Sequence, residues 1–417
     1  MSELDEKLAI LGGRPICQRP LEPPAWPPLS RATAARLKEV YLSGQWSFHS
    51  PAEQEFAQAF ADYHGAKHGV FMANGTVTLQ CALKACGVGK GDEVIVPAMT
   101  WMATAMVAHY VGATPVFVDV EPTTLCMDPA QVEAAVTDRT RAIIPVHLYG
   151  STADLEAILH IADRHDLVVI EDCAHVHGGK WDGRGVGSWG KVGSFSFQQS
   201  KTMSSGEGGI CITDDDELAA RIFRAKHIGY MTGTAQGQAS QGPPPGEICH
   251  NFRSTAFHAV ILSDQLAELP DRIERYDRNA QRLQRRLADV SGVRIQSRGR
   301  LANPQSYYYL VFIFDEGPLA SVPRQGIKEA MGAEGLYPGF THGPVYQHPL
   351  FNLLPGDYRI FEGRCPVAET VGTERALVLP HQMLGMDEDV IDTIGRIVAK
   401  VAEHGGALLA TSSECVS

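Results

Sequence analysis

The chain contains seven short runs of apolar residues, each about the length of one β-strand. The runs are rich in valine, isoleucine and phenylalanine, and several are apolar throughout rather than alternating with polar residues. Strands with this pattern are buried on both faces, as in a mostly parallel sheet. The predicted strands are residues 68–73, 93–97, 114–119, 142–146, 167–171, 192–197 and 209–213.

Helix-compatible stretches precede these runs and lie between most of them, at residues 32–41, 52–63, 77–85, 104–110, 129–136, 152–164 and 214–227. This alternation predicts an α/β sandwich with right-handed crossovers. A long helix is expected from residue 256 to about 290, interrupted near Pro270 because proline removes a backbone donor. A further strand over 306–315 and helices over 327–335 and 387–403 predict a second, smaller α/β unit.

These patterns divide the chain into five predicted parts. They are an N-terminal arm (1–30) on the surface, a large domain (31–265), a connecting helix (266–300), a small C-terminal domain (301–405) and a frayed tail (406–417). Within the large domain, residues 231–248 are rich in glycine, glutamine and proline, and are expected to form a mobile loop.

Composition narrows the class of protein. The net charge of −12 disfavours nucleic acids and anionic membranes as partners, because both require a basic surface. The nine scattered cysteines include no CxxC pair, which indicates free thiols in a reducing compartment. The charged N-terminus does not resemble a signal peptide, and no apolar run approaches the roughly 20 residues of a membrane span. We therefore expect a cytoplasmic protein.

The most informative residue is Lys201, which lies four residues after the run at 192–197 and is followed by a glycine-rich turn. An acidic pair, Glu171 and Asp172, ends the preceding strand. An enzyme that uses pyridoxal phosphate (PLP) needs a lysine for the Schiff base, a carboxylate for the pyridine nitrogen and small hydroxyl residues for the phosphate. A single lysine after a strand is usually a surface residue, so the prediction depends on the whole set.

Other residues fit the same cofactor, although most of them have a simpler alternative. Asp172 can face a pyridinium, or it can cap a turn. Ser196 can offer its hydroxyl to the phosphate. The triplet at 74–76 (Asn-Gly-Thr) lies between a strand and a helix, where backbone N–H groups bind phosphate, although a plain capped turn has the same pattern. Trp101 follows a strand at the sheet edge where ligands bind, or it is a partly buried core residue.

Two other motifs do not support a nucleotide site. The sequence at 185–190 matches GxGxxG, but it precedes a strand instead of following one and opening a helix. The sequence at 87–91 resembles part of a P-loop, but glycine follows Lys90 where serine or threonine would bind magnesium. The 16 histidines show no metal-ligand spacing, so no metal is expected.

The complete set of motifs resembles the DegT/DnrJ/EryC1/StrS family of PLP-dependent sugar and cyclitol aminotransferases. The resemblance extends from about residue 8 to about residue 403, and it implies fold type I, with a mostly parallel seven-stranded sheet in the large domain. The motifs that carry it are residues 11–15, 74–76, 96–101, 145–150, 171–175, 194–201 and 206–209.

The resemblance implies a role for each matching residue. Lys201 would form the aldimine with PLP, and Asp172 would pair with the pyridine nitrogen. Gly75, Thr76 and Ser196 match phosphate ligands of the family, Trp101 matches the stacking aromatic residue, and His175 falls where a side chain approaches the phenolic oxygen. Residues 250–253 resemble an Asn-Tyr-Arg motif, with Phe252 in place of tyrosine. Asn251 would then reach the cofactor of a neighbouring subunit, which implies a homodimer with shared active sites.

The branch that the sequence resembles most contains L-glutamine:scyllo-inosose aminotransferases and 3-amino-5-hydroxybenzoate synthases. We therefore expect a ping-pong transfer of an amino group from L-glutamine or L-glutamate to a cyclic ketone, in aminocyclitol or aminosugar antibiotic biosynthesis. Lys201 would act as the general base. The candidate substrate residues are Glu207, Arg253, His342 and Tyr346, of which Arg253 could hold the donor carboxylate.

Several alternatives remain open at this point. An aromatising hydroxybenzoate synthase would keep Lys201, and so would an aminotransferase acting on a nucleotide-linked keto-sugar. The absence of a basic patch weakly disfavours a nucleotide sugar. A PLP-dependent sugar dehydratase of the family would carry histidine at position 201, and a non-enzymatic regulatory relative would have lost Lys201 or Asp172. The chain retains both residues, which disfavours these last two alternatives.

Overall fold

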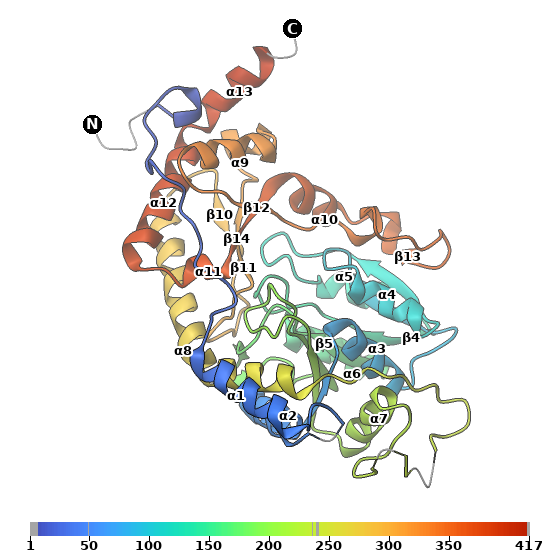
Figure 1. The fold of residues 1–417 in the computed structure, drawn as a ribbon. Helices are drawn as coiled ribbons and strands as arrows, with labels where there is room; N and C mark the ends of the chain where they lie inside the picture. Colours follow the sequence, from blue (N-terminus) through green and yellow to red (C-terminus); the bar gives the residue numbers. More distant parts are fainter. Residues whose placement is uncertain (1–6, 49, 236, 239–241, 415–417) are drawn as a thin grey trace.

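The computed structural model describes residues 7–48, 50–235, 237–238 and 242–414 (Figure 1). Its central element is an eight-stranded sheet with the strand order β1-β9-β8-β5-β4-β2-β3-β13. The seven predicted strands are confirmed as β1 His68–Met72, β2 Glu93–Pro97, β3 Thr114–Val118, β4 Thr140–Ile143, β5 Val168–Asp172, β8 Val192–Ser196 and β9 Gly209–Thr213. Most of their residues are buried, as expected for strands covered on both faces.

The sheet is parallel from β8 to β13, whereas β9 pairs antiparallel with both β8 and β1. The carboxyl ends of β2, β5 and β8 therefore lie at one edge of the sheet. Open α/β sheets bind their ligands at that edge.

The eighth strand corrects the prediction of seven. Strand β13 (Arg359–Ile360) pairs in parallel with β3 at the edge of the sheet, although this segment was expected to belong to the small domain. Arg359 Nη2 donates to Glu93 Oε2 at 3.1 Å and to the carbonyl of Ala135 at 3.0 Å. A strand this short has no apolar periodicity, so long-range pairing decides its position.

Helices cover both faces of the sheet, and their ends follow local sequence signals. The side chains of Asn74, Asp154 and Asp215 cap α3, α6 and α7 by accepting backbone N–H groups of the first turn. The helices are α1 Arg31–Ser43, α2 Pro51–His64, α3 Gly75–Ala85, α4 Ala103–Tyr110, α5 Pro129–Ala135, α6 Leu155–His165 and α7 Asp216–Lys226.

The long helix α8 (Ala256–Leu287) runs through Pro270, so the expected interruption is wrong. Pro270 is exposed, and water can satisfy the carbonyl that loses its N–H donor. The first half of α8 packs Leu262 and Leu269 against the large sheet, whereas the second half packs Leu283 and Leu287 against the C-terminal unit. One helix thus joins two hydrophobic cores (Figure 1).

The C-terminal unit is built on a four-stranded antiparallel sheet with the order β10-β11-β14-β12. Its strands are β10 Arg294–Ile295, β11 Tyr309–Ile313, β12 Gly339–Phe340 and β14 Ala376–Pro380, and its helices are α9 Arg324–Ala333, α10 Pro366–Thr370, α11 His381–Leu384, α12 Glu388–Glu403 and α13 Gly405–Glu414. The last helix lies where we expected the tail to begin, and Leu408 within it is buried. Residues 415–417 of that tail lie outside the described residues.

Two expectations stay predictions. The first is the five-part division of the chain. The second is the mobility of the 231–248 loop, whose residues 236 and 239–241 lie outside the described part. The cysteines in the described segments are all free thiols. No described helix combines the length and the apolar character that crossing a membrane requires.

The N-terminal segment is anchored to the C-terminal unit. Leu8 is buried in the core of that unit. The carboxylate of Glu334 accepts the backbone N–H groups of Ala9 and Ile16, and it pairs with Lys400 Nζ at 3.0 Å. From there the segment, coloured blue in Figure 1, runs past α11 to α1. It connects the C-terminal unit with the large sheet along the side that carries α8.

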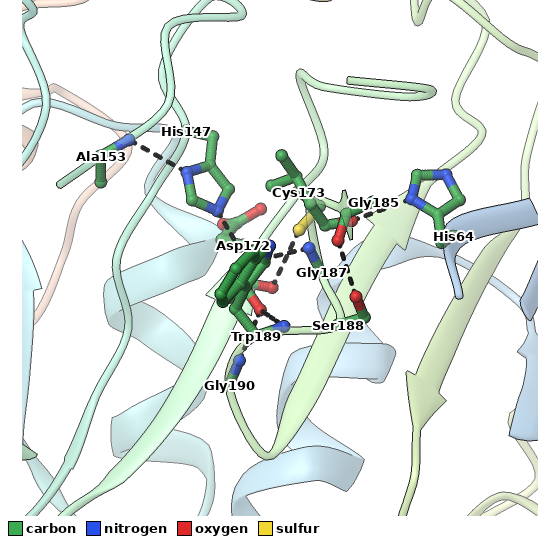
Figure 2. A network of polar contacts seen from close by, with 12 residues as sticks. His64, His147, Ala153, Asp172, Cys173, Gly185, Gly187, Ser188, Trp189 and Gly190 are labelled. Atoms are coloured by element: carbon green, nitrogen blue, oxygen red, sulfur yellow. Dashed lines mark hydrogen bonds and ion pairs between the residues drawn. The ribbon is translucent and has the colours of Figure 1, made fainter. Parts of the chain in front are cut away.

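A buried carboxylate organises the loop beside the end of β5 (Figure 2). Glu171 is fully buried, and its two oxygens accept four hydrogen bonds. The backbone N–H of Gly187 and Nε2 of His147 donate to one oxygen, and the N–H groups of Trp189 and Gly190 donate to the other. Burial by itself would raise the pKa of Glu171, but these hydrogen bonds lower it below the ordinary value.

This network explains the GxGxxG sequence at 185–190, whose N–H groups bind an internal carboxylate instead of a nucleotide. It also explains why His147, Glu171 and Cys173 lie close enough together to resemble a metal site. Nδ1 of His147 accepts from the N–H of Ala153, so Nε2 carries the hydrogen that is donated to Glu171. Burial raises the pKa of the Cys173 thiol well above its ordinary value. The cluster is therefore a closed hydrogen-bond network.

We predict that Glu171→Gln destabilises the protein by about 2–4 kcal/mol at pH 7, because an amide group would face two N–H donors. Since folding lowers the pKa of Glu171, its stabilisation is complete above the unfolded-state value of about 4.3 and is lost as the pH falls below it. Thermal unfolding of wild type and variant should therefore differ most at neutral pH and converge in acid.

Glu156→Gln is the matched control, because the one ion pair of Glu156 with a described residue is the exposed pair with Arg300. Equal melting temperatures for Glu171→Gln and Glu156→Gln at neutral pH would contradict the structural role of the Glu171 network.

Candidate active site

A cavity of about 690 Å³ lies at the carboxyl ends of the parallel strands, beside the N-terminus of α3. Its walls include most of the residues that the sequence analysis selected. These are Gly75, Thr76, Trp101, Asp172, His175, Ser196, Lys201, Glu207 and His342.

Lys201 lies in the turn that follows β8, and its amine projects over an aromatic ring. Nζ is 4.4 Å from the ring centroid of Tyr308. In the part of the chain that the structure describes, no hydrogen bond or ion pair engages this amine. Burial lowers the pKa of Lys201 to about 8, while the charge of Asp172 opposes that change. The amine is thus placed to react in its neutral form near physiological pH.

Asp172 ends β5 and is buried at the floor of the cavity. Oδ2 accepts from Thr104 Oγ1 at 2.8 Å, and Oδ1 accepts from the N–H of Ala174 at 3.2 Å. Burial raises the pKa of this carboxyl group, and these hydrogen bonds together with Lys201 only partly offset the rise. A cationic ring nitrogen beside it would favour the carboxylate form.

The N-terminus of α3 forms the opposite end of the cavity. Asn74 Oδ1 accepts from the N–H of Val77, whereas the N–H groups of Gly75 and Thr76 have no acceptor among the described residues. A Cβ atom on Gly75 would lie 2.6 Å from Cβ of Ser196, so only glycine allows this close approach of α3 to β8. The free N–H groups and the positive end of the helix dipole suit an anion, which fits the predicted phosphate contact.

His175 lies between two tyrosine rings. Its ring stacks on Tyr308 with centroids 4.3 Å apart, and on Tyr149 at 5.8 Å. Nδ1 accepts from the N–H of Tyr149 at 3.2 Å, so Nε2 carries the hydrogen. Burial lowers the pKa of His175 well below its ordinary value, which keeps the ring neutral. The residue can therefore donate one hydrogen bond into the cavity.

Aromatic and acidic residues surround the opening of the cavity. Trp101 is 47% exposed, and its ring lies 5.9 Å from that of His342 and 6.1 Å from that of His348. Burial lowers the pKa of His342 to about 4. Glu207 is exposed at the rim. These side chains are positioned to contact a substrate.

Three predicted residues are not part of this cavity within one chain. Asn251 is exposed, and its proposed contact with a neighbouring subunit stays a prediction. Arg253 lies 5.5 Å from the ring of Phe48 and does not line the cavity. Tyr346 donates to Glu369 Oε1 at 2.7 Å, which gives it a structural contact away from the cavity.

The sequence analysis missed two residues of the site. Tyr308 contacts both Lys201 and His175 but comes from the C-terminal unit, immediately before β11. The run of three tyrosines at 307–309, just before an apolar strand, was the available signal. Thr104 lies in the first turn of α4, four residues after Thr100, and their hydroxyl groups lie 3.0 Å apart. That spacing alone is too common to identify a site.

The arrangement fits PLP. One end offers free N–H groups and the hydroxyl of Ser196, the floor offers a carboxylate, and the same cavity is lined by the Lys201 amine, which has no hydrogen-bond partner among the described residues. The chemistry of this donor set matches the phosphate, the ring nitrogen and the aldehyde of PLP in turn.

Comparison with known proteins places this site in a family. The profile of the DegT/DnrJ/EryC1/StrS aminotransferase family matches residues 28–399. The L-glutamine:2-deoxy-scyllo-inosose aminotransferase of Streptoalloteichus tenebrarius is 40% identical, over 97% of this chain and 99% of its own length. The L-glutamine:scyllo-inosose aminotransferase of Streptomyces griseus is 39% identical, over 96% of this chain and 99% of its own length.

Solved structures agree with these relatives. The crystal structure of 3-amino-5-hydroxybenzoic acid synthase superposes with a TM-score of 0.83 at 30% identity, covering 93% of this chain and all of that one. A structure of DesI, determined in the presence of its TDP-sugar product, superposes with a TM-score of 0.81 at 30% identity, covering 97% and 99%. This chain therefore belongs to the DegT/DnrJ/EryC1/StrS aminotransferase family, as a PLP-dependent aminotransferase of fold type I.

Proposed function

We propose that this aminotransferase transfers the amino group of L-glutamine to the ketone of an uncharged cyclitol of the inosose type. The observation that carries the proposal is the charge of the cavity. Among the cavity-lining residues that the structure describes, Lys201 is the only lysine or arginine, and the remaining polar groups are hydroxyl, amide, imidazole, indole and carboxyl groups. Such a lining suits a polyhydroxylated ring better than a diphosphate, which requires cationic partners. The two inosose aminotransferases at about 40% identity support the same acceptor class.

Within this proposal, different residues of the chain would bind different parts of PLP. The N–H groups of Gly75 and Thr76, together with Ser196 Oγ, would hold the phosphate. Asp172 would hold the protonated ring nitrogen, and Nε2–H of His175 would donate to the phenolic oxygen. Trp101 would cover the ring. Bound PLP supplies the electron sink that makes the Cα–H bond of an amino acid acidic.

Lys201 would be both the attachment point of the cofactor and the proton carrier. Its Nζ would take the proton from Cα of the donor and would then deliver a proton to the carbon that receives the amino group. A lowered pKa suits both tasks, because the amine must be neutral to accept a proton and must release it afterwards. In the second half of the cycle, the same atom would move protons in the reverse direction while the ketone is aminated.

Two alternative reactions would use the same cofactor and the same lysine. The likeness to 3-amino-5-hydroxybenzoic acid synthase at 30% identity supports an aromatising reaction less strongly than the inosose relatives support transamination. The likeness to DesI keeps a nucleotide-linked keto-sugar as a candidate acceptor. L-Glutamate is the alternative donor, and a homodimer in which Asn251 serves a neighbouring site is part of the proposal.

We predict how fast a small amine-directed reagent labels Lys201 in the cofactor-free enzyme at different pH values. The labelling rate should rise with pH and reach half its maximum near pH 8, because burial lowers the pKa of Lys201 to about 8. Asp172→Asn should move that midpoint to lower pH, since the carboxylate opposes the effect of burial. Peptide mass spectrometry measures the labelling, and the exposed Lys38 serves as an internal reference. An unchanged midpoint in the variant would contradict the electrostatic link between the two residues.

The proposed reaction itself is tested by absorption spectroscopy of the PLP-loaded enzyme. We expect L-glutamine to convert the visible cofactor band to the shorter-wavelength band of the amine form, and 2-deoxy-scyllo-inosose or scyllo-inosose to restore it. Lys201→Ala should abolish both changes, lowering the turnover rate by more than about a thousandfold. A response to L-glutamate alone, with recovery only by a nucleotide-linked keto-sugar, would overturn the cyclitol proposal.

A further inference from the structure

Three side chains hydrogen-bond to consecutive backbone carbonyl groups of the turn that carries Lys201. The carbonyl groups of residues 200–202 each accept one side-chain hydrogen bond. His381 Nε2 bonds to the first at 3.2 Å, Trp26 Nε1 donates to the second at 3.1 Å, and Arg272 Nη1 donates to the third at 3.3 Å. The second of these carbonyls belongs to Lys201 itself.

The three donors come from distant parts of the chain and pack on one another. Trp26 belongs to the N-terminal segment, Arg272 to α8, and His381 to the first position of α11. The ring of Trp26 meets His381 edge-on at 4.7 Å, and the guanidinium of Arg272 lies 5.2 Å from the Trp26 ring. We call these three residues the carbonyl clamp.

The tautomer of His381 fits this arrangement. The ring is buried, and its Nδ1 lies 3.4 Å from the hydroxyl of Tyr276, which can donate to it. Nε2 then carries the hydrogen that is donated to the carbonyl of Ser200. Burial lowers the pKa of His381 to about 3, so the donor stays neutral across the physiological range.

The turn depends on such contacts because it lies outside the sheet ladder. Residues 200–208 follow β8 and form neither a helix nor a strand, so their carbonyl groups lack regular partners. The Lys201 amine is not fixed by any hydrogen bond of its own within the described residues. The position of the amine above the Tyr308 ring therefore depends on the backbone to which it is attached.

We propose that Trp26 is a positioning residue, which acts through the carbonyl of Lys201 to hold the lysine amine in its working position. This inference rests on the proposed role of Lys201. The N-terminal segment is docked on the C-terminal unit through Leu8 and Glu334, so Trp26 couples that unit to the lysine turn. Displacing a reacting group by about 1 Å can cost up to about a hundredfold in rate.

Trp26→Phe tests the proposal, because it keeps a ring against His381 but removes the N–H donor. In the cofactor-free protein, we expect amide hydrogen exchange in the peptide covering residues 198–208 to accelerate about tenfold. In the PLP-loaded enzyme, we expect kcat to fall about tenfold while KM for the donor changes less than about twofold. The pH midpoint of the visible cofactor band should shift as well.

Arg272→Gln supplies a second variant if Trp26→Phe folds poorly, and Arg278→Gln is its matched control. Both arginines form an i,i+4 ion pair on α8, with Glu268 and Glu274 respectively, but only Arg272 reaches the turn. We expect the first substitution to accelerate exchange at residues 198–208 and the second to leave it unchanged.

The outcomes separate the two proposals. Wild-type exchange and an unshifted cofactor band in both Trp26→Phe and Arg272→Gln would overturn the carbonyl clamp. A uniform loss of stability, with normal kcat per folded molecule and a normal band, would also overturn it, because Trp26 would then be only structural. A wild-type enzyme that forms no cofactor band would instead overturn the proposed function, while the exchange measurement would still test the clamp.

Discussion

Two adjacent carboxylates are buried at the end of β5, and the surrounding structure satisfies them in different ways. Neighbouring side chains of a strand point to opposite faces, so Glu171 and Asp172 meet different environments. Glu171 receives four hydrogen bonds and is fully compensated. Asp172 receives only two and faces the cavity, where burial raises its pKa. A buried acid with this deficit is stabilised by a cationic ligand, and the active site is organised around that requirement.

The same cavity also contains a buried donor group that lacks acceptors in the described structure. The amine of Lys201 lies over the ring of Tyr308 and has no hydrogen-bond acceptor in the described segments of the chain, and burial lowers its pKa to about 8. The free N–H groups of Gly75 and Thr76 are a third set of polar groups without partners among the described residues. Polar groups left unsatisfied inside a protein are costly, so such sites are retained where a ligand completes them. In the proposed function, PLP would bring an anion, a cation and an aldehyde to these three places.

Much of this could be predicted from sequence because the relevant signals are local. Apolar runs identified the seven long strands, since a strand buried on both faces needs no polar residue. Lys201, Asp172 and the turn at 74–76 stood out because each follows a strand, and the ends of parallel strands converge. The predictions failed where distant contacts decide the structure. The helix α8 continues through Pro270 because two cores hold it, and β13 forms because Arg359 bonds to Glu93.

The sequence by itself determined the fold class, the cofactor chemistry and the positions of the lysine and the aspartate. The signals that identify them, which are the periodicity and the order of strands and turns, depend on residues that are close together in the sequence. Only the tertiary structure decided which residues surround the lysine. Tyr308 reaches Nζ from another sheet, and Trp26 and His381 reach the backbone of the lysine turn from opposite ends of the chain. No local pattern records such contacts, since they arise from the packing of segments that the sequence separates by more than a hundred residues.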